Sequence, residues 1–206
     1  MTKAVWGSRI RLVTAVVLTI ASASCGDVVR QGTASSYLVI STLEGASGAD
    51  PTKFGTNVFS DVITINKDDG TATIFEDPGR VTFKLGMKDP GSAGTAVTPT
   101  QNNWITLSQY HVQYVRSDGH NVEGVDVPYA FDGGMTGTVG TADLTGGFMV
   151  VRSQAKQEAP LAALQTNPIA ISTIAKVTFY GRDQTGREVS VTGSIDVTFA
   201  NYGDPK

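Results

Sequence analysis

The chain has 206 residues, with one cysteine, 16 Lys and Arg, and 19 Asp and Glu, which give a net charge of −3 at pH 7. A mildly acidic composition without a basic cluster argues against nucleic acid and anionic lipid headgroups as partners. A single cysteine excludes an internal disulfide, so burial of apolar surface has to stabilise the fold.

The first 25 residues have the layout of a secretory signal. Three basic residues precede the apolar run of residues 13–20, and the small residues 21–24 lead to Cys25. The apolar run is shorter than the roughly 20 residues that span a bilayer. We therefore expect residues 1–24 to be a cleaved signal peptide. Cleavage leaves 13 Lys and Arg against 19 Asp and Glu, a net charge of −6.

Small residues directly before a lone cysteine resemble the lipobox of bacterial lipoproteins, although Ser22 stands where that family carries an aliphatic residue. The resemblance implies that the sulfur of Cys25 receives a diacylglycerol, which anchors the protein in the cell envelope. The next residue, Gly26, is not acidic, and by the same resemblance this implies the outer membrane. The alternative is an ordinary cleavage site at residues 21–23, which would release a soluble secreted or periplasmic protein.

Beyond the signal, the sequence predicts a tether and then one β domain. Residues 25–35 are small and polar without periodicity, which is typical of a flexible tether. Residues 36–206 are expected to form a single domain. Period-two alternation predicts strands over residues 37–43, 58–65, 71–75 and 81–88. Asn66–Gly70 predicts a hairpin turn between the second and the third of these strands.

The second half of the chain continues the β pattern. A strand over residues 104–116 changes phase near Ser108 and Gln109, which predicts a β-bulge. Residues 117–134 are the longest irregular stretch. Further strands are predicted over residues 136–139, over 148–151 with an extension to 158 as a charged edge strand, and over the hairpin 171–180 and 188–199. Residues 160–165 are the only helix candidate.

Many short strands with turns between them and at most one short helix predict an all-β sandwich. The segment from Val177 to Val189 resembles the closing hairpin of bacterial immunoglobulin-like domains. Combined with the lipobox, the chain resembles uncharacterised bacterial lipoproteins that carry such a domain. The resemblance implies an immunoglobulin-like antiparallel β-sandwich and supplies no catalytic residue.

Candidate site residues lie mainly in the 117–134 stretch. Three aromatic residues could form a platform for a glycan or a partner chain, or could instead cover the end of the core: Trp104, Tyr129 and Phe131. Three acids offer oxygen ligands for calcium, but their spacing is that of turn residues, so no metal is predicted: Asp118, Asp126 and Asp132. No serine has the sequence context of a nucleophile beside either histidine, so we expect neither catalysis nor a cofactor.

These patterns together predict a lipid-anchored cell-envelope module that binds a partner or has a structural role. Its contacts would be the membrane, through the lipid, and another envelope protein or a glycan. The alternative function is an envelope carbohydrate-binding or hydrolytic accessory protein that uses the loop of residues 117–134.

Overall fold

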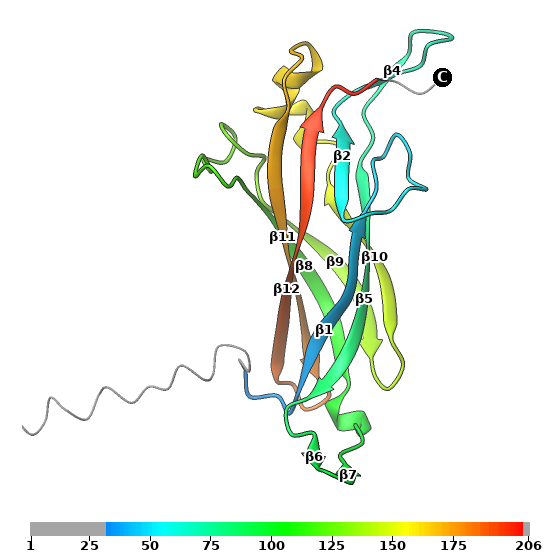
Figure 1. Ribbon diagram of the computed structural model, residues 1–206, viewed down its shortest axis with the longest axis vertical. Coiled ribbons are helices and arrows are strands. Elements are labelled where there is room, and N and C mark those ends of the chain that lie inside the picture. The colour runs from blue at the N-terminus through cyan, green and yellow to red at the C-terminus, as the bar shows by residue number, and fades with distance from the viewer. Residues whose placement is uncertain (1–31, 204–206) are drawn as a thin grey trace, which may run out of the picture. The chain divides into compact units, whose positions relative to one another are not determined.

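Two β-sheets face each other and share one core in the computed structural model, which describes residues 32–203 (Figure 1). The first sheet has the order β1 (Ser36–Gly45), β5 (Asp77–Met87) and β10 (Leu144–Val151). The second has the order β2 (Asn57–Asp61), β12 (Glu188–Ala200), β11 (Ile171–Asp183), β8 (Ile105–Val115) and β9 (Phe131–Val139). Neighbouring strands are antiparallel except β2 and β12, which are parallel.

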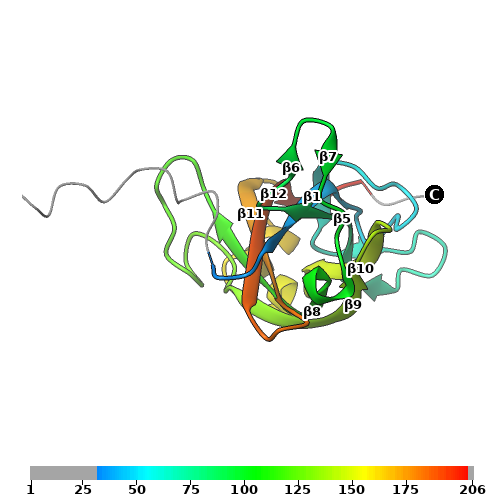
Figure 2. The ribbon, with the colours of Figure 1, turned by 90° about the horizontal axis from the view of Figure 1, so that it is seen from below.

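The remaining elements are short and lie at the ends of the sheets (Figures 1 and 2). Two ribbons of two residues per strand pair β3 (Thr64–Ile65) with β4 (Ala72–Thr73) and β6 (Gly91–Ser92) with β7 (Thr95–Ala96). Three 3₁₀ segments are η2 (Gln101–Asn103), η3 (Ala155–Gln157) and η4 (Leu161–Gln165). The structure is therefore mostly β, as predicted, with three short helical segments over residues 32–203 in place of at most one.

An aromatic cluster joins the two sheets at the centre of the core. Phe179 on β11 meets Phe83 on β5 edge to face, with ring centroids 4.9 Å apart, and Phe148 on β10 at 5.3 Å. Tyr110 on β8 lies 5.6 Å from Phe148. Edge-to-face contacts of this kind add to the stabilisation from burial. The rings belong to strands of both sheets, so the cluster fixes the sheets against each other.

Two tyrosines from β8 bind the backbone of β10, which has a register shift between Met149 and Val151. The Tyr110 hydroxyl accepts a hydrogen bond from the Met149 N–H at 3.0 Å, and the Tyr114 hydroxyl donates to the carbonyl of Val150 at 2.6 Å. Burial raises the pKa of the Tyr114 phenol far above its usual range. The irregular part of an edge strand thus obtains its hydrogen bonds from the opposite sheet.

The structure confirms the predicted strands over residues 37–43, 81–88 and 104–116, and it confirms the hairpin of β11 and β12. The predicted bulge of β8 is present as a register shift between Leu107 and Gln109 against β9. Residues 58–65 are not one strand, because β2 ends at Asp61 and pairs with β12, and β3 starts again at Thr64. The predicted turn is correct, since the Gly70 N–H donates to the carbonyl of Asn66.

Two further boundaries differ from the prediction. Residues 152–158 are not an edge strand, because the chain turns after β10 and forms η3, which buries Lys156. The following η4, which covers most of the predicted helix of residues 160–165, buries Leu161 and Leu164. The loop of residues 117–134 is shorter than expected, since β9 already begins at Phe131.

The predicted signal peptide, Cys25 and tether residues 25–31 lie outside the described residues. The last tether residues, 32–35, contact the domain: Ala34 is buried, and Lys88 on the segment after β5 binds the carbonyls of Gly32 and Ser35. No helix over residues 32–203 is both long and apolar enough to cross a membrane.

Candidate binding surfaces and a buried charge cluster

Hydrogen bonds within the loop fix residues 116–130, which connect β8 to β9. The Val122 N–H donates to the Asp126 carboxylate at 3.0 Å. The Gly124 N–H donates to the carbonyl of Val127 at 2.8 Å. These contacts within a few residues, together with the burial of Val127 in the core, hold the backbone of the loop in one shape.

This fixed loop exposes apolar side chains. Val122, Val125 and Tyr129 have exposed fractions of 60%, 67% and 50%. The ring of Tyr129 lies against Gly124, where a Cβ atom would be 2.3 Å from the phenol oxygen and where φ is +74°. Large apolar side chains gathered on a rigid loop are typical of a contact surface.

The structure does not bring the three predicted aromatic residues together. Phe131 is buried on β9 beneath the Arg152 guanidinium, which lies 4.5 Å from its ring centroid. Trp104 precedes the start of β8, at the end of the strand remote from Val112, the residue that pairs with Phe131. Of the three, only Tyr129 lies in the exposed loop. Trp104 and Phe131 lie at opposite ends of the β8 and β9 pair.

The three acids considered as calcium ligands each make a different contact. Asp118 binds the Arg116 guanidinium, which holds the pKa of that carboxyl well below its usual range. Asp126 accepts the backbone bond inside the loop. Asp132 lies on β9 and contacts His111 across the strand pair, with 2.8 Å between Oδ1 and Nδ1. No group of three His, Cys, Asp or Glu residues over 32–203 could hold a metal ion.

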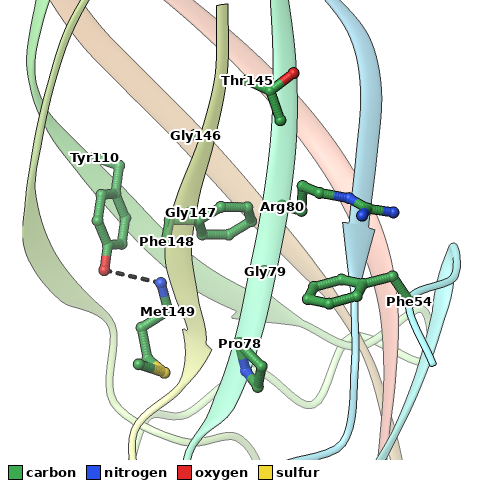
Figure 3. Close-up of a pocket in the computed structure, with 10 residues that line it drawn as sticks. All are labelled: Phe54, Pro78, Gly79, Arg80, Tyr110, Thr145, Gly146, Gly147, Phe148 and Met149. Atoms are coloured by element: carbon green, nitrogen blue, oxygen red, sulfur yellow. Dashed lines mark hydrogen bonds between the residues drawn. The ribbon is translucent and has the colours of Figure 1, made fainter. Parts of the chain in front are cut away.

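An open hollow of about 530 Å³ lies along β5 and β10 (Figure 3). Glycines 79, 146 and 147 line it, together with Phe54 and Arg80, whose guanidinium lies 4.6 Å from the Phe54 ring centroid. Ring atoms of Phe148 occupy the space where Gly79 would carry a side chain. The only sequence signal for this hollow is the glycine pair within a strand.

A charge cluster is buried where β2, β5 and η3 meet. Lys156 and Asp77 have no exposed side-chain surface, and Nζ lies 2.8 Å from Oδ1. The Lys156 ammonium also donates to the carbonyl of Asp61 at 2.8 Å. The Asp77 carboxylate accepts the Gly48 N–H on Oδ1 at 2.7 Å and the Ser60 hydroxyl on Oδ2 at 2.5 Å.

Burial is the dominant influence on this cluster. It raises the pKa of Asp77 above its ordinary value, although the neighbouring Lys156 cation and the hydrogen bonds act in the opposite direction. The sequence pattern did not predict this cluster, because the alternation around Lys156 is that of the exposed side of an edge strand. Residues 77 and 156 are 79 positions apart, so no local pattern connects them.

No protein-family model matches the chain, and comparison with curated proteins finds no match. The function therefore has to be inferred from the residues and surfaces of the chain itself.

Proposed function

We propose that the protein is a lipid-anchored cell-envelope module that binds a partner protein through the loop of residues 116–130. The observation that carries the proposal is the exposure of Val122, Val125 and Tyr129 on a backbone fixed by its own hydrogen bonds. A fixed loop loses little conformational entropy on binding, and its exposed apolar side chains gain from burial.

The arrangement of strands supports an immunoglobulin-like fold as part of this proposal. Immunoglobulin domains place strands A, B, E and D in one sheet and G, F, C and C′ in the other. The order β1-β5-β10 corresponds to A-B-E, and β12-β11-β8-β9 corresponds to G-F-C-C′. No strand corresponds to D in the described part of the chain. Antibody domains join B to F by a disulfide, and here Phe83 and Phe179 make the corresponding contact.

The loop of residues 116–130 lies near the end of the domain remote from Gly32, and this agrees with an anchor that precedes the domain. Gly32 lies beside Glu188 at the start of β12, since a Cβ atom at Gly32 would be 3.1 Å from the Glu188 carbonyl oxygen. The loop follows Val115, which pairs with Ile174 near the other end of the second sheet (Figure 1). An anchor at Cys25 would leave this end of the domain free to meet a partner.

The anchor is tested by the intact mass of the protein from a bacterial membrane fraction. We expect a chain that begins at Cys25 and carries a diacylglycerol, and a Cys25→Ser variant without the lipid. A soluble product that begins at Ser24 would contradict the lipoprotein assignment and leave the binding surface to be tested separately.

The binding surface is tested with a photo-crosslinking amino acid at position 125 in living cells. Position 97 is the matched control, because Val97 is also an exposed valine, with an exposed fraction of 45%, and lies outside the loop. We expect a discrete adduct from position 125 that Val122→Asp abolishes, and no adduct from position 97. Equal labelling from both positions, or no adduct from position 125, would refute the proposed surface.

A further inference from the structure

We propose that the side chains of Lys156 and Asp77 become joined by an intramolecular amide bond. The two reacting groups are already in contact, with Nζ 2.8 Å from Oδ1, and neither side chain has exposed surface. Holding an amine and a carboxyl group together in this way replaces an encounter in solution with a step inside one molecule, which corresponds to effective concentrations of about 10⁵–10⁸ M in well-oriented cases.

Burial favours the uncharged forms that the reaction needs. An ion pair removed from water loses the hydration of both charges. Transfer of one proton from the Lys156 ammonium to the Asp77 carboxylate, along their hydrogen bond, gives an amine and a carboxylic acid. The raised pKa of Asp77 acts in the same direction. The neutral amine has the lone pair that makes it a nucleophile.

The bond-forming step needs no further reactant. The Nζ lone pair attacks Cγ of Asp77, and the new N–C bond gives a tetrahedral intermediate. The Gly48 N–H and the Ser60 hydroxyl, which already donate to the two carboxyl oxygens, would stabilise the negative charge on oxygen. One C–O bond then breaks, the departing oxygen takes up the two protons lost by the amine and the acid, and one water molecule leaves.

The hydrogen-bond acceptors around the Lys156 nitrogen match an amide N–H better than an ammonium group. An ammonium group has three N–H donors, but among residues 32–203 only Asp77 and Asp61 accept from Lys156. A side-chain amide has one N–H, for which the Asp61 carbonyl is the acceptor, and it keeps one of the two carboxyl oxygens, which accepts from the donor already bound to it, the Gly48 N–H on Oδ1 or the Ser60 hydroxyl on Oδ2. The reaction thus removes a buried donor that has no acceptor.

Peptide mapping of the purified full-length product tests the bond. Trypsin cleaves after Lys and Arg, so the unlinked chain yields the separate peptides 68–80 and 153–156. An amide at Lys156 blocks cleavage there. We expect a branched peptide in which residues 68–80 are attached to residues 153–176, with a mass lower by one water than the sum of the two peptides.

The intact mass of the wild-type protein provides a second measurement, and two variants serve as its controls. The wild-type protein should be lighter by one water than its sequence with the same N-terminus. Lys156→Met should have its full sequence mass. Lys84→Met, which removes an exposed lysine paired with Asp143, should keep the loss of water. A wild-type protein at full sequence mass with an unbranched 68–80 peptide would overturn the proposal, whether or not Lys156→Met folds.

Discussion

Replacing Phe179 by alanine removes the side chain that touches most of the aromatic cluster between the sheets. The ring is fully buried and meets Phe83, Phe148 and Tyr110 at centroid distances of 4.9, 5.3 and 6.2 Å. Truncation of a buried Phe to Ala costs about 3–5 kcal/mol of unfolding free energy. The remaining three rings belong to different strands and cannot easily close the cavity, so we expect about 4–5 kcal/mol, the upper part of this range.

Urea denaturation followed by far-UV circular dichroism measures this loss. For a domain of this size, a change of 1 kcal/mol shifts the melting temperature by about 2–4 °C, so Phe179→Ala should melt roughly 8–20 °C below the wild type. Phe59→Ala is the matched control, because Phe59 has an exposed fraction of 60%. It should cost about 1 kcal/mol or less. Equal losses for the two variants would refute the conclusion that the cluster holds the sheets together.

Three further variants or treatments test other contacts. Tyr114→Phe removes the hydroxyl bound to the Val150 carbonyl, so equilibrium unfolding should show a loss of about 1–3 kcal/mol. Asp183→Ala should also lose about 1–3 kcal/mol, because the carboxylate accepts from Thr185 and the Arg187 N–H. Burial alone would raise the pKa of Asp183, but these hydrogen bonds lower it below the ordinary 3.8. The difference in unfolding free energy between the wild type and Asp183→Ala should therefore be constant well above pH 3.8 and shrink as the pH falls below it. EDTA should leave the melting temperature unchanged, since no group of metal ligands lies in the part of the chain that is described; a sharp decrease would contradict this.

Local alternation predicted the strands whose two faces differ most. In β11, burial alternates from Ile171 to Asp183, and one sheet face is apolar at nearly every second position. The same reasoning found the bulge of β8, because an inserted residue changes the phase of the pattern. The parallel pairing of β2 with β12 has no counterpart in the local sequence pattern. Residues 57 and 196 are joined only in the folded chain.

The charge cluster shows why part of the interior could not be predicted. Alternating charged and small residues around Lys156 gave a pattern typical of an edge strand. The decisive facts were an acid 79 positions away and two backbone groups from other segments. Phe131 was misplaced for a related reason, since the glycines that follow it suggested a loop and instead lie within β9. Gly133 there makes room for the ring of Tyr110.

The pairing of β12 with β2 gives the domain a defined response to mechanical force. Gly32 lies beside the beginning of β12, and Ala200 is the last residue of the same strand. Tension between these points is directed along β12. The five residue pairs that join β12 to β2 would then be loaded in shear, so their hydrogen bonds must break together and not one after another. Because forced unfolding is governed by the unfolding rate, the domain should resist stretching between Gly32 and Ala200 more strongly than its equilibrium stability alone implies.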